Sequence, residues 1–169
     1  PNHTMDSYRA FNVEYFNFLL SCASDGEKSI DFILLAGAYT LLDLSAWEDG
    51  ILQMCIDNNV GVVIGGAFNS GVLATGAVPG AMFNYEPAPQ HIMERTQKLE
   101  DVCKEFDVPL AAAALQFSLG HPAVTTVIPG CKSAAEVERS VETMNVTIPP
   151  ALWARMKEEK LLPDGVPTP

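Results

Sequence analysis

The sequence has no long hydrophobic run and few basic residues. No stretch approaches the 18 consecutive apolar residues of a membrane-spanning helix, and the amino terminus lacks a basic segment followed by an apolar core. We therefore expect neither a membrane span nor a signal peptide. Lys and Arg number 10 against 21 Asp and Glu, which gives a formal net charge of −11. Because no run of basic residues offsets this charge, we expect no binding to nucleic acid or anionic membranes, and any phosphate must be held by local groups.

Cysteine and histidine are also sparse and lack metal-binding patterns. The four cysteines are widely spaced with no Cys-x-x-Cys pair, and three of them fall on apolar stretches typical of a core. We interpret them as reduced thiols in a cytoplasmic protein. His3, His91 and His121 share no ligand spacing, so we expect no metal site. His121 precedes Pro122 and is expected in a surface turn.

What the chain does have is a core and an alternation of strands and helices. Its 169 residues are 48% hydrophobic, enough for one well-buried domain. Continuous apolar runs predict buried parallel strands at residues 31–36, 60–64 and 124–128. Amphipathic or apolar patterns predict helices at residues 11–23, 45–58, 92–106, 110–119 and 151–161 and one after Ser133. Ser45 with Glu48 is expected to cap the helix at 45–58. This order predicts an α/β fold with a parallel sheet and no domain boundary.

Loops that follow parallel strands are the expected place for a ligand. The three strands lead into Ala38-Tyr39, into an unusually long Gly-rich and Pro-rich loop at residues 65–89, and into Pro129–Ser133. Glycines near the start of the long loop allow close backbone approach, and Asn and Ser supply short hydrogen-bonding groups. The alternative interpretation of the segment at 66–76 is a flexible turn.

The turn at residues 127–136 is the most informative local pattern. Pro129-Gly130 end a strand, and Ser133 with Glu136 three residues later predicts a capped helix start. Unpaired N–H groups and the positive end of the helix dipole, with Lys132 beside them, favour a bound phosphate. An ordinary strand-to-helix turn that binds nothing is the alternative.

Four segments in order resemble the carboxyl half of the aldo-keto reductases. They are residues 33–43 (ILLAGAYTLLD), 69–76 (NSGVLATG), 111–117 (AAAALQF) and 127–130 (VIPG). Within that family the chain resembles in particular the sugar-oxidising branch of D-threo-aldose (L-fucose) 1-dehydrogenases and its relative pyridoxal 4-dehydrogenase. The resemblance runs from about Asn12 to the carboxyl terminus.

The resemblance implies the carboxyl half of a (β/α)₈ TIM barrel, about strands 5/6 to 8, present as an incomplete barrel. Residues 1–169 would then form one partial domain. Its parts are a divergent start at 1–11, the barrel half at 12–162 and a Pro-rich tail at 163–169. The implied cofactor is NAD or NADP, bound without the GxGxxG loop of Rossmann enzymes, which the chain lacks.

The resemblance also implies cofactor-binding positions. Those around the pyrophosphate are Asn69, Ser70, Gly71 and Leu73. Those at the adenosine phosphate end are Ile128, Pro129, Gly130, Lys132 and Ser133. Asn12 matches the polar residue that holds the nicotinamide carboxamide. The chain departs from the family at two positions near the rings of the cofactor. Arg139-Ser140 replace a Glu-Asn pair that lies near the adenine in relatives. Gly65 replaces the aromatic residue that stacks on the nicotinamide in many relatives, so that this stacking is lost or moved to Phe68.

The family's catalytic Asp, Tyr, Lys and His come from the first half of the barrel and have no counterpart here, so we expect no catalytic residue in this chain. The implied function is hydride transfer between a nicotinamide cofactor and a sugar or small aldehyde, with the catalytic half missing from a truncated chain. The alternative is a non-catalytic remnant or a module that binds nucleotide or a partner protein. Because of its open barrel face, we also expect the isolated chain to self-associate, to pair with another half or to be poorly soluble.

Overall fold

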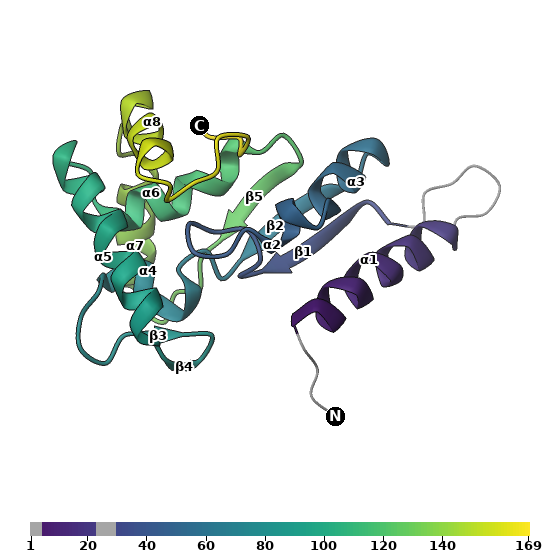
Figure 1. The fold of residues 1–169 in the computed structure, drawn as a ribbon, viewed down its shortest axis with the longest axis horizontal. Helices are drawn as coiled ribbons and strands as arrows, with labels where there is room; N and C mark the ends of the chain where they lie inside the picture. The colour runs from purple at the N-terminus through teal and green to yellow at the C-terminus, as the bar shows by residue number, and fades with distance from the viewer. Residues whose placement is uncertain (1–4, 23–29) are drawn as a thin grey trace.

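A three-stranded parallel sheet organises the structure, a computed structural model that describes residues 5–22 and 30–169 and side chains from residue 13 on. The strands are β1 (Phe32–Ala36), β2 (Gly61–Gly65) and β5 (Val124–Ile128), in the order β1-β2-β5. Ala36 pairs with Gly65 and Gly65 pairs with Ile128, so the three carboxyl ends are aligned. All three strands confirm the prediction from the apolar runs (Figure 1).

Helices connect the strands and cover one side of the sheet. The elements outside the sheet are α1 (Met5–Ser21), α2 (Ser45–Glu48), α3 (Ile51–Asp57), η1 (Asn69–Gly71), α4 (Val72–Thr75), a hairpin of β3 (Met82–Phe83) and β4 (Glu86–Pro87), α5 (Gln90–Glu105), α6 (Leu110–Phe117), η2 (Ser118–Gly120), α7 (Ala134–Met144) and α8 (Pro150–Glu158). Parallel strands joined by helices confirm the α/β class.

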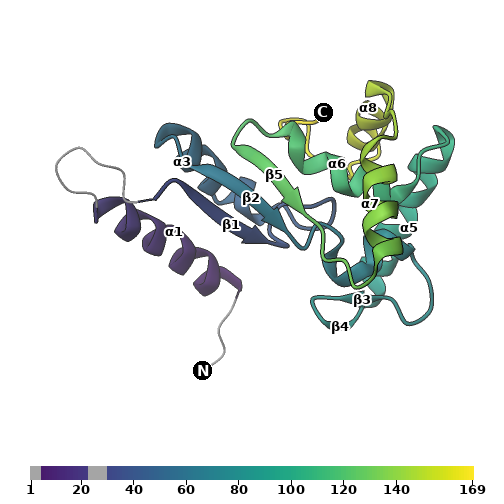
Figure 2. The same ribbon diagram turned by 180° about the vertical axis from the view of Figure 1, so that it is seen from behind.

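The two faces of the sheet differ sharply in burial. Successive side chains of a strand point to opposite faces. On one face, Val62 and Ile64 are fully buried beneath the helices. On the other, Phe32 is 66% exposed, Leu34 54% and Ile128 47%. Figure 2 views the three strands from a side on which no described helix crosses them. We call this the open face.

Aromatic rings fill the core on the covered side. Tyr39 and Phe117 have ring centroids 5.1 Å apart, and Phe117 lies 6.2 Å from Trp153 by the same measure. These rings come from the loop after β1, from α6 and from α8, so they join the sheet to the helices. The Pro-rich tail packs on this core: Val166 is buried, and its carbonyl accepts a hydrogen bond of 2.8 Å from Lys157 Nζ.

The helix predicted at residues 45–58 is in fact two helices. Leu44, not Ser45, is the N-cap of α2 and makes no side-chain capping bond, while the Ser45 hydroxyl donates to Asp43 Oδ1 at 2.6 Å. Gly50 adopts a φ of 77° and separates α2 from α3. The predicted Ser45–Glu48 cap is therefore wrong, because Asp43 satisfies the serine locally.

His121 is buried, which corrects the expectation of a surface turn. Its side chain is 5% exposed, its ring contacts Tyr39 edge-on with centroids 5.5 Å apart, and Nδ1 accepts a hydrogen bond from the Ala123 N–H at 3.2 Å. Burial lowers the pKa of His121 below its ordinary value of 6.5. The sequence pattern missed this position because the ring packs against Tyr39, which is 82 residues away in the sequence.

Three cysteines were expected in the core, and two are buried there. Cys55 and Cys103 are buried, and burial raises their thiol pKa values to about 11 and about 12, with Glu100 adding to the effect at Cys103. Cys22 and Cys131 are exposed, and all four thiols are free. Among the helices of the described residues, none combines the length and apolarity that crossing a bilayer requires.

The burial of His121 predicts a pH-dependent stability. As pH falls through about 6.5, the unfolded chain takes up a proton that the folded protein resists, so the free energy of unfolding decreases. We expect the urea midpoint of the native chain to drop between pH 7.5 and pH 5.5, and His121→Asn to drop less. His91→Gln, at an exposed position of α5, is the matched control and should keep the native slope. An unchanged slope in His121→Asn would show that another group causes the loss.

Candidate functional site

The carboxyl edge of the sheet brings three loops together. The paired ends Ala36, Gly65 and Ile128 lead directly into the loops that begin at Gly37, Gly66 and Pro129. The Gly37 N–H donates to the Gly65 carbonyl at 2.9 Å, which ties the first two loops. The sequence predicted this convergence, but Tyr39, expected in the first of these loops, is fully buried in the core. Here we call the region the strand-end site. It consists of Gly37, Gly66–Gly71 and Pro129–Ser133.

Glycine is required where the first two loops touch. Gly66 has a φ of 63°, and a Cβ at this position would stand 3.3 Å from the Gly37 nitrogen. Gly37 itself has a φ of 70°, and a Cβ there would stand 3.7 Å from Asn69 Nδ2. The side chain of Asn69 therefore lies directly against the backbone of Gly37.

Asn69 is the most unusual polar residue of the site. It is only 2% exposed, and neither Oδ1 nor Nδ2 finds a hydrogen-bond partner within the described part of the chain. A buried polar group without a partner costs about 1–3 kcal/mol. Arg95 Nε, Thr96 Oγ1 and Ser118 Oγ also lack partners, so it is the position of Asn69 at the strand ends that makes it a candidate for contact with a ligand.

The backbone of Asn69–Gly71 is also strained. The φ angles are 45° at Asn69, 61° at Ser70 and 110° at Gly71. Left-handed backbone at a residue other than glycine costs about 1–3 kcal/mol and persists where the surroundings hold it. One such restraint is visible, because the Ser70 hydroxyl accepts a hydrogen bond of 2.9 Å from the N–H of Tyr85 in the β3–β4 hairpin.

Leu73, predicted beside the pyrophosphate, contributes to the core instead of the surface. Its side chain is fully buried in α4, and its N–H donates to the Phe68 carbonyl at 3.2 Å. Phe68 is half-buried and packs against the core. A cofactor contact at either residue remains a prediction.

The capped start of α7 confirms the predicted turn. Ser133 is the N-cap, and its hydroxyl accepts from the Glu136 N–H at 3.3 Å. The Glu136 carboxylate reaches back one residue further than a standard capping box and accepts from the Lys132 N–H at 2.7 Å. A negative charge thus already sits at this helix start, where a phosphate would have to compete with it.

The rest of this turn is open to ligands. The side chains of Lys132 and Ser133 are exposed, Gly130 has no atom within 4 Å of where a Cβ would be, and Ile128 is half-exposed. The Cys131 Sγ lies 3.6 Å from the Ser140 hydroxyl. These positions can receive a phosphate, and their assignment to a cofactor stays a prediction.

Asn12 lies apart from the strand-end loops in the sequence. Its backbone belongs to α1, and its side chain lies outside the described residues. Its predicted contact with the nicotinamide carboxamide is therefore untested. Of the predicted cofactor residues, those of the two loops after β2 and β5 are brought to one edge of the sheet.

The sequence analysis did not predict the β3–β4 turn. Asn84 and Tyr85 have φ angles of 51° and 65°, and Tyr85 is 90% exposed. The one signal available was Asn84, because asparagine tolerates left-handed backbone. The hydrogen bond to Ser70 joins this turn to the strand-end site.

A cavity of about 400 Å³ lies elsewhere, and none of the predicted site residues lines it. Its walls are Leu44, Glu48, Arg95 and residues 160–164. Arg95 donates from Nη2 to the Leu161 carbonyl at 2.7 Å; burial lowers its pKa, and the charge of Glu48 opposes that effect. We interpret Arg95 as a residue that ties the segment after α8 to α5. Within residues 13–22 and 30–169, no three His, Cys, Asp or Glu side chains gather in a group that could hold a metal ion.

Comparison with known proteins gives a consistent result. A model of the Aldo/keto reductase family matches residues 11–160. Pyridoxal 4-dehydrogenase from Microbacterium luteolum is 39% identical over 136 residues, which are 80% of this chain and 40% of that protein. D-threo-aldose 1-dehydrogenase from a Pseudomonas species is 35% identical over 138 residues, 81% of this chain and 42% of that protein. The chain thus spans less than half the length of these curated relatives.

Solved structures support the same fold. The holo form of aldo-keto reductase AKR11C1 from Bacillus halodurans matches with a TM-score of 0.65 at 24% identity, covering 90% of this chain and 48% of that one. Its apo form matches with a TM-score of 0.64 at 23% identity and the same coverage.

The Ser133 cap has a measurable effect on stability. We expect Ser133→Ala to reduce the free energy of unfolding by about 1 kcal/mol, because the Glu136 N–H loses its acceptor. Ser133→Asp keeps an acceptor at the helix start and should stay close to the native value. Urea denaturation followed by circular dichroism measures both variants. Equal stability of Ser133→Ala and the native chain would contradict a capping role.

Proposed function

Because the chain belongs to the aldo/keto reductase family, we propose that it is the dinucleotide-binding part of an NAD(P)-dependent oxidoreductase. The reaction is hydride transfer between nicotinamide and a sugar or small carbonyl compound. The observation that carries this proposal is the strand-end site, where the strained segment Asn69–Gly71 and the capped turn before α7 leave one sheet edge together.

The residues of the strand-end site fit a dinucleotide. Asn69 has two amide atoms in need of partners, Gly37 and Gly66 allow close backbone approach, and Lys132 with the α7 start offers positive charge. The pyrophosphate would be held along Asn69–Gly71, and the adenosine phosphate at Lys132 and Ser133. The bound cofactor would supply the hydride acceptor or donor.

Tyr39, the one buried tyrosine of the described residues, does not offer a catalytic proton donor. Tyr39 is fully buried, its hydroxyl lies 3.5 Å from the Pro167 carbonyl, and burial raises its pKa well above the ordinary value. A catalytic tyrosine needs the opposite shift, so that it can exchange a proton near neutral pH. We therefore propose that the proton donor comes from outside this chain.

The open face supports the carboxyl half of a barrel as the architecture. A closed barrel would bury the exposed Phe32, Leu34 and Ile128 against further strands. Helix α7 has a second uncovered stripe, Val137, Val141 and Met144, between 39% and 57% exposed. A group of other strands and helices that completes the barrel would cover both surfaces and could bring the catalytic residues.

The second candidate is a binding module without turnover. The chain spans 40–42% of its curated relatives, and the features that support nucleotide binding do not depend on catalysis. The two proposals make the same prediction for cofactor binding and differ in turnover once a complementary barrel half is supplied.

Cofactor binding is tested by calorimetric titration of the chain with NAD+ and NADP+. We expect binding to weaken about tenfold in Lys132→Ala, because one phosphate loses a charge-assisted hydrogen bond. Lys98→Ala, at an exposed position of α5, is the matched control and should bind as the native chain does. Glu136→Gln should tighten binding, because it removes the negative charge that now accepts from the Lys132 N–H.

Turnover is followed in the same samples by the absorbance of reduced cofactor after addition of L-fucose. We expect binding without turnover. Turnover by the chain alone would disprove the absence of a proton donor, and no binding of either dinucleotide would disprove the proposed function itself.

The open face is expected to drive self-association of the isolated chain. Two copies that bury Phe32 and Leu34 each gain apolar contact, whereas the net charge of −11 opposes association, so the assembly should strengthen with added salt. Sedimentation velocity should show species larger than a monomer, and Leu34→Lys should restore the monomer. Ile56→Lys, at an exposed apolar position of α3, is the control and should leave assembly unchanged. A native chain that stays monomeric at every concentration and salt level would rule this out.

A further inference from the structure

The β3–β4 hairpin carries a tyrosine in a costly conformation. The hairpin pairs Phe83 with Glu86 and Met82 with Pro87, and the two residues between, Asn84 and Tyr85, both have left-handed backbone. Two-residue turns of this kind commonly place glycine at the second position, where a side chain is unfavourable. Tyr85 occupies that position with a φ of 65°.

The strain of the described chain is concentrated around this turn. Seven residues other than glycine have positive φ: Asn59, Asn69, Ser70, Asn84, Tyr85, Asp107 and Lys160. Four of them lie in two segments that the hydrogen bond from the Tyr85 N–H to the Ser70 hydroxyl joins. Residues held in such conformations cluster at ligand clamps and active sites.

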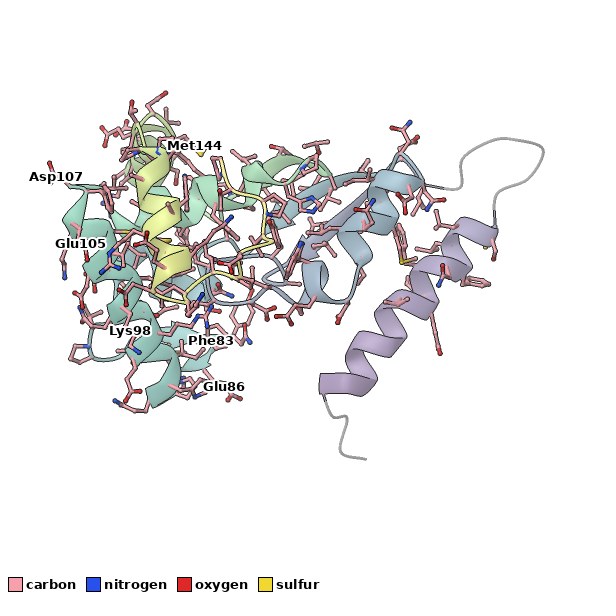
Figure 3. All side chains as sticks on the ribbon, turned by 45° about the horizontal axis from the view of Figure 1, so that its top comes forward. Phe83, Glu86, Lys98, Glu105, Asp107 and Met144 are labelled. Carbon is pink, nitrogen blue, oxygen red and sulfur yellow. The ribbon has the colours of Figure 1, made fainter. Side chains whose placement is uncertain are left out.

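The Tyr85 side chain obtains no packing in return. It is 90% exposed, the most exposed of the large apolar or aromatic side chains described, whereas its neighbour Phe83 packs against the core and anchors the hairpin. Figure 3 labels Phe83 and Glu86, which lie near the amino-terminal end of α5. An exposed aromatic ring on a turn whose backbone is tethered to Ser70 is suited to cover a ligand.

The charges of the hairpin favour a neutral ring as the ligand that Tyr85 would cover. Residues 77–90 contain no Lys, Arg or His, and Glu86 follows Tyr85 directly. A phosphate would be repelled there, whereas a heteroaromatic base can stack on the tyrosine face.

We propose that the Tyr85 ring stacks on the adenine of the dinucleotide. This inference rests on the proposed function, since Ser70 belongs to the segment assigned to the pyrophosphate, and a base attached to that pyrophosphate lies within reach of the tethered turn. Adenine, not nicotinamide, is the ring, because the reacting ring requires a position over the strand ends from which water is excluded. The hairpin tip is exposed and lies off the sheet (Figure 1).

Two substitutions of Tyr85 separate stacking from a structural role. Tyr85→Phe keeps the ring and should bind NAD+ within about twofold of the native chain. Tyr85→Gly removes the ring and should bind about tenfold more weakly, the size that stacking of one base supports. The same glycine relieves left-handed strain, so Tyr85→Gly should unfold at the same or a higher temperature. Val78→Ala, at an exposed position of the same loop, is the control.

Fragments of the cofactor identify which ring is bound. Titration with AMP should show the same weakening in Tyr85→Gly, and titration with nicotinamide mononucleotide should not. Equal NAD+ affinity of Tyr85→Gly and the native chain would overturn the proposal while leaving the proposed function intact. Weakening confined to nicotinamide mononucleotide would overturn the choice of adenine. If the native chain binds no dinucleotide, the proposed function and this proposal fail together.

Discussion

The in-register ending of three parallel strands is the constraint on which the site depends. Ala36 pairs with Gly65 and Gly65 with Ile128, so the loop after β2 starts one strand spacing from each of the other two loops. Gly37 and Gly66 let the first two loops touch, and the Gly37 N–H bonds the Gly65 carbonyl. A slip of one residue in this register would separate Asn69 from Gly37 and turn the covered face of the sheet outward. The fold and the proposed binding surface therefore share one determinant.

Strain and unsatisfied hydrogen bonding both accumulate at this edge. Asn69 is buried without partners, Asn69–Gly71 are left-handed, and the tether from Ser70 passes the constraint to a second left-handed turn at Tyr85. Each feature lowers the stability of the free chain. Together they make the strand ends our candidate for a ligand site. The cavity around Arg95 has one of these features, because Arg95 Nε also lacks a partner while Nη2 bonds the Leu161 carbonyl, but none of the left-handed backbone of Asn69–Gly71. The open face lowers the stability of the free chain in a different way, because apolar side chains such as Leu34 remain exposed to water.

Much of this fold could be predicted from sequence periodicity, and the exceptions have physical causes. Continuous apolar runs predicted all three sheet strands, and Ser133 with Glu136 predicted the start of α7. The predicted cap at Ser45 was wrong because Asp43 offers that serine a nearer partner, and the burial of His121 was missed because tertiary packing against Tyr39 turns the ring inward. At the site, glycine and asparagine marked the loops, but the backbone strain at Ser70 and Tyr85 arises from contacts between distant segments, which a local pattern does not contain.

The most direct test of the account is a map of amide chemical shifts by heteronuclear NMR as NAD+ or NADP+ is added to the chain. The account predicts that the largest changes fall at residues 65–73, at Tyr85 and at residues 128–133, and that α3 and the residues around Arg95 change little. Changes centred on the cavity between Glu48, Arg95 and residues 160–164, or no saturable change at the strand ends, would contradict it.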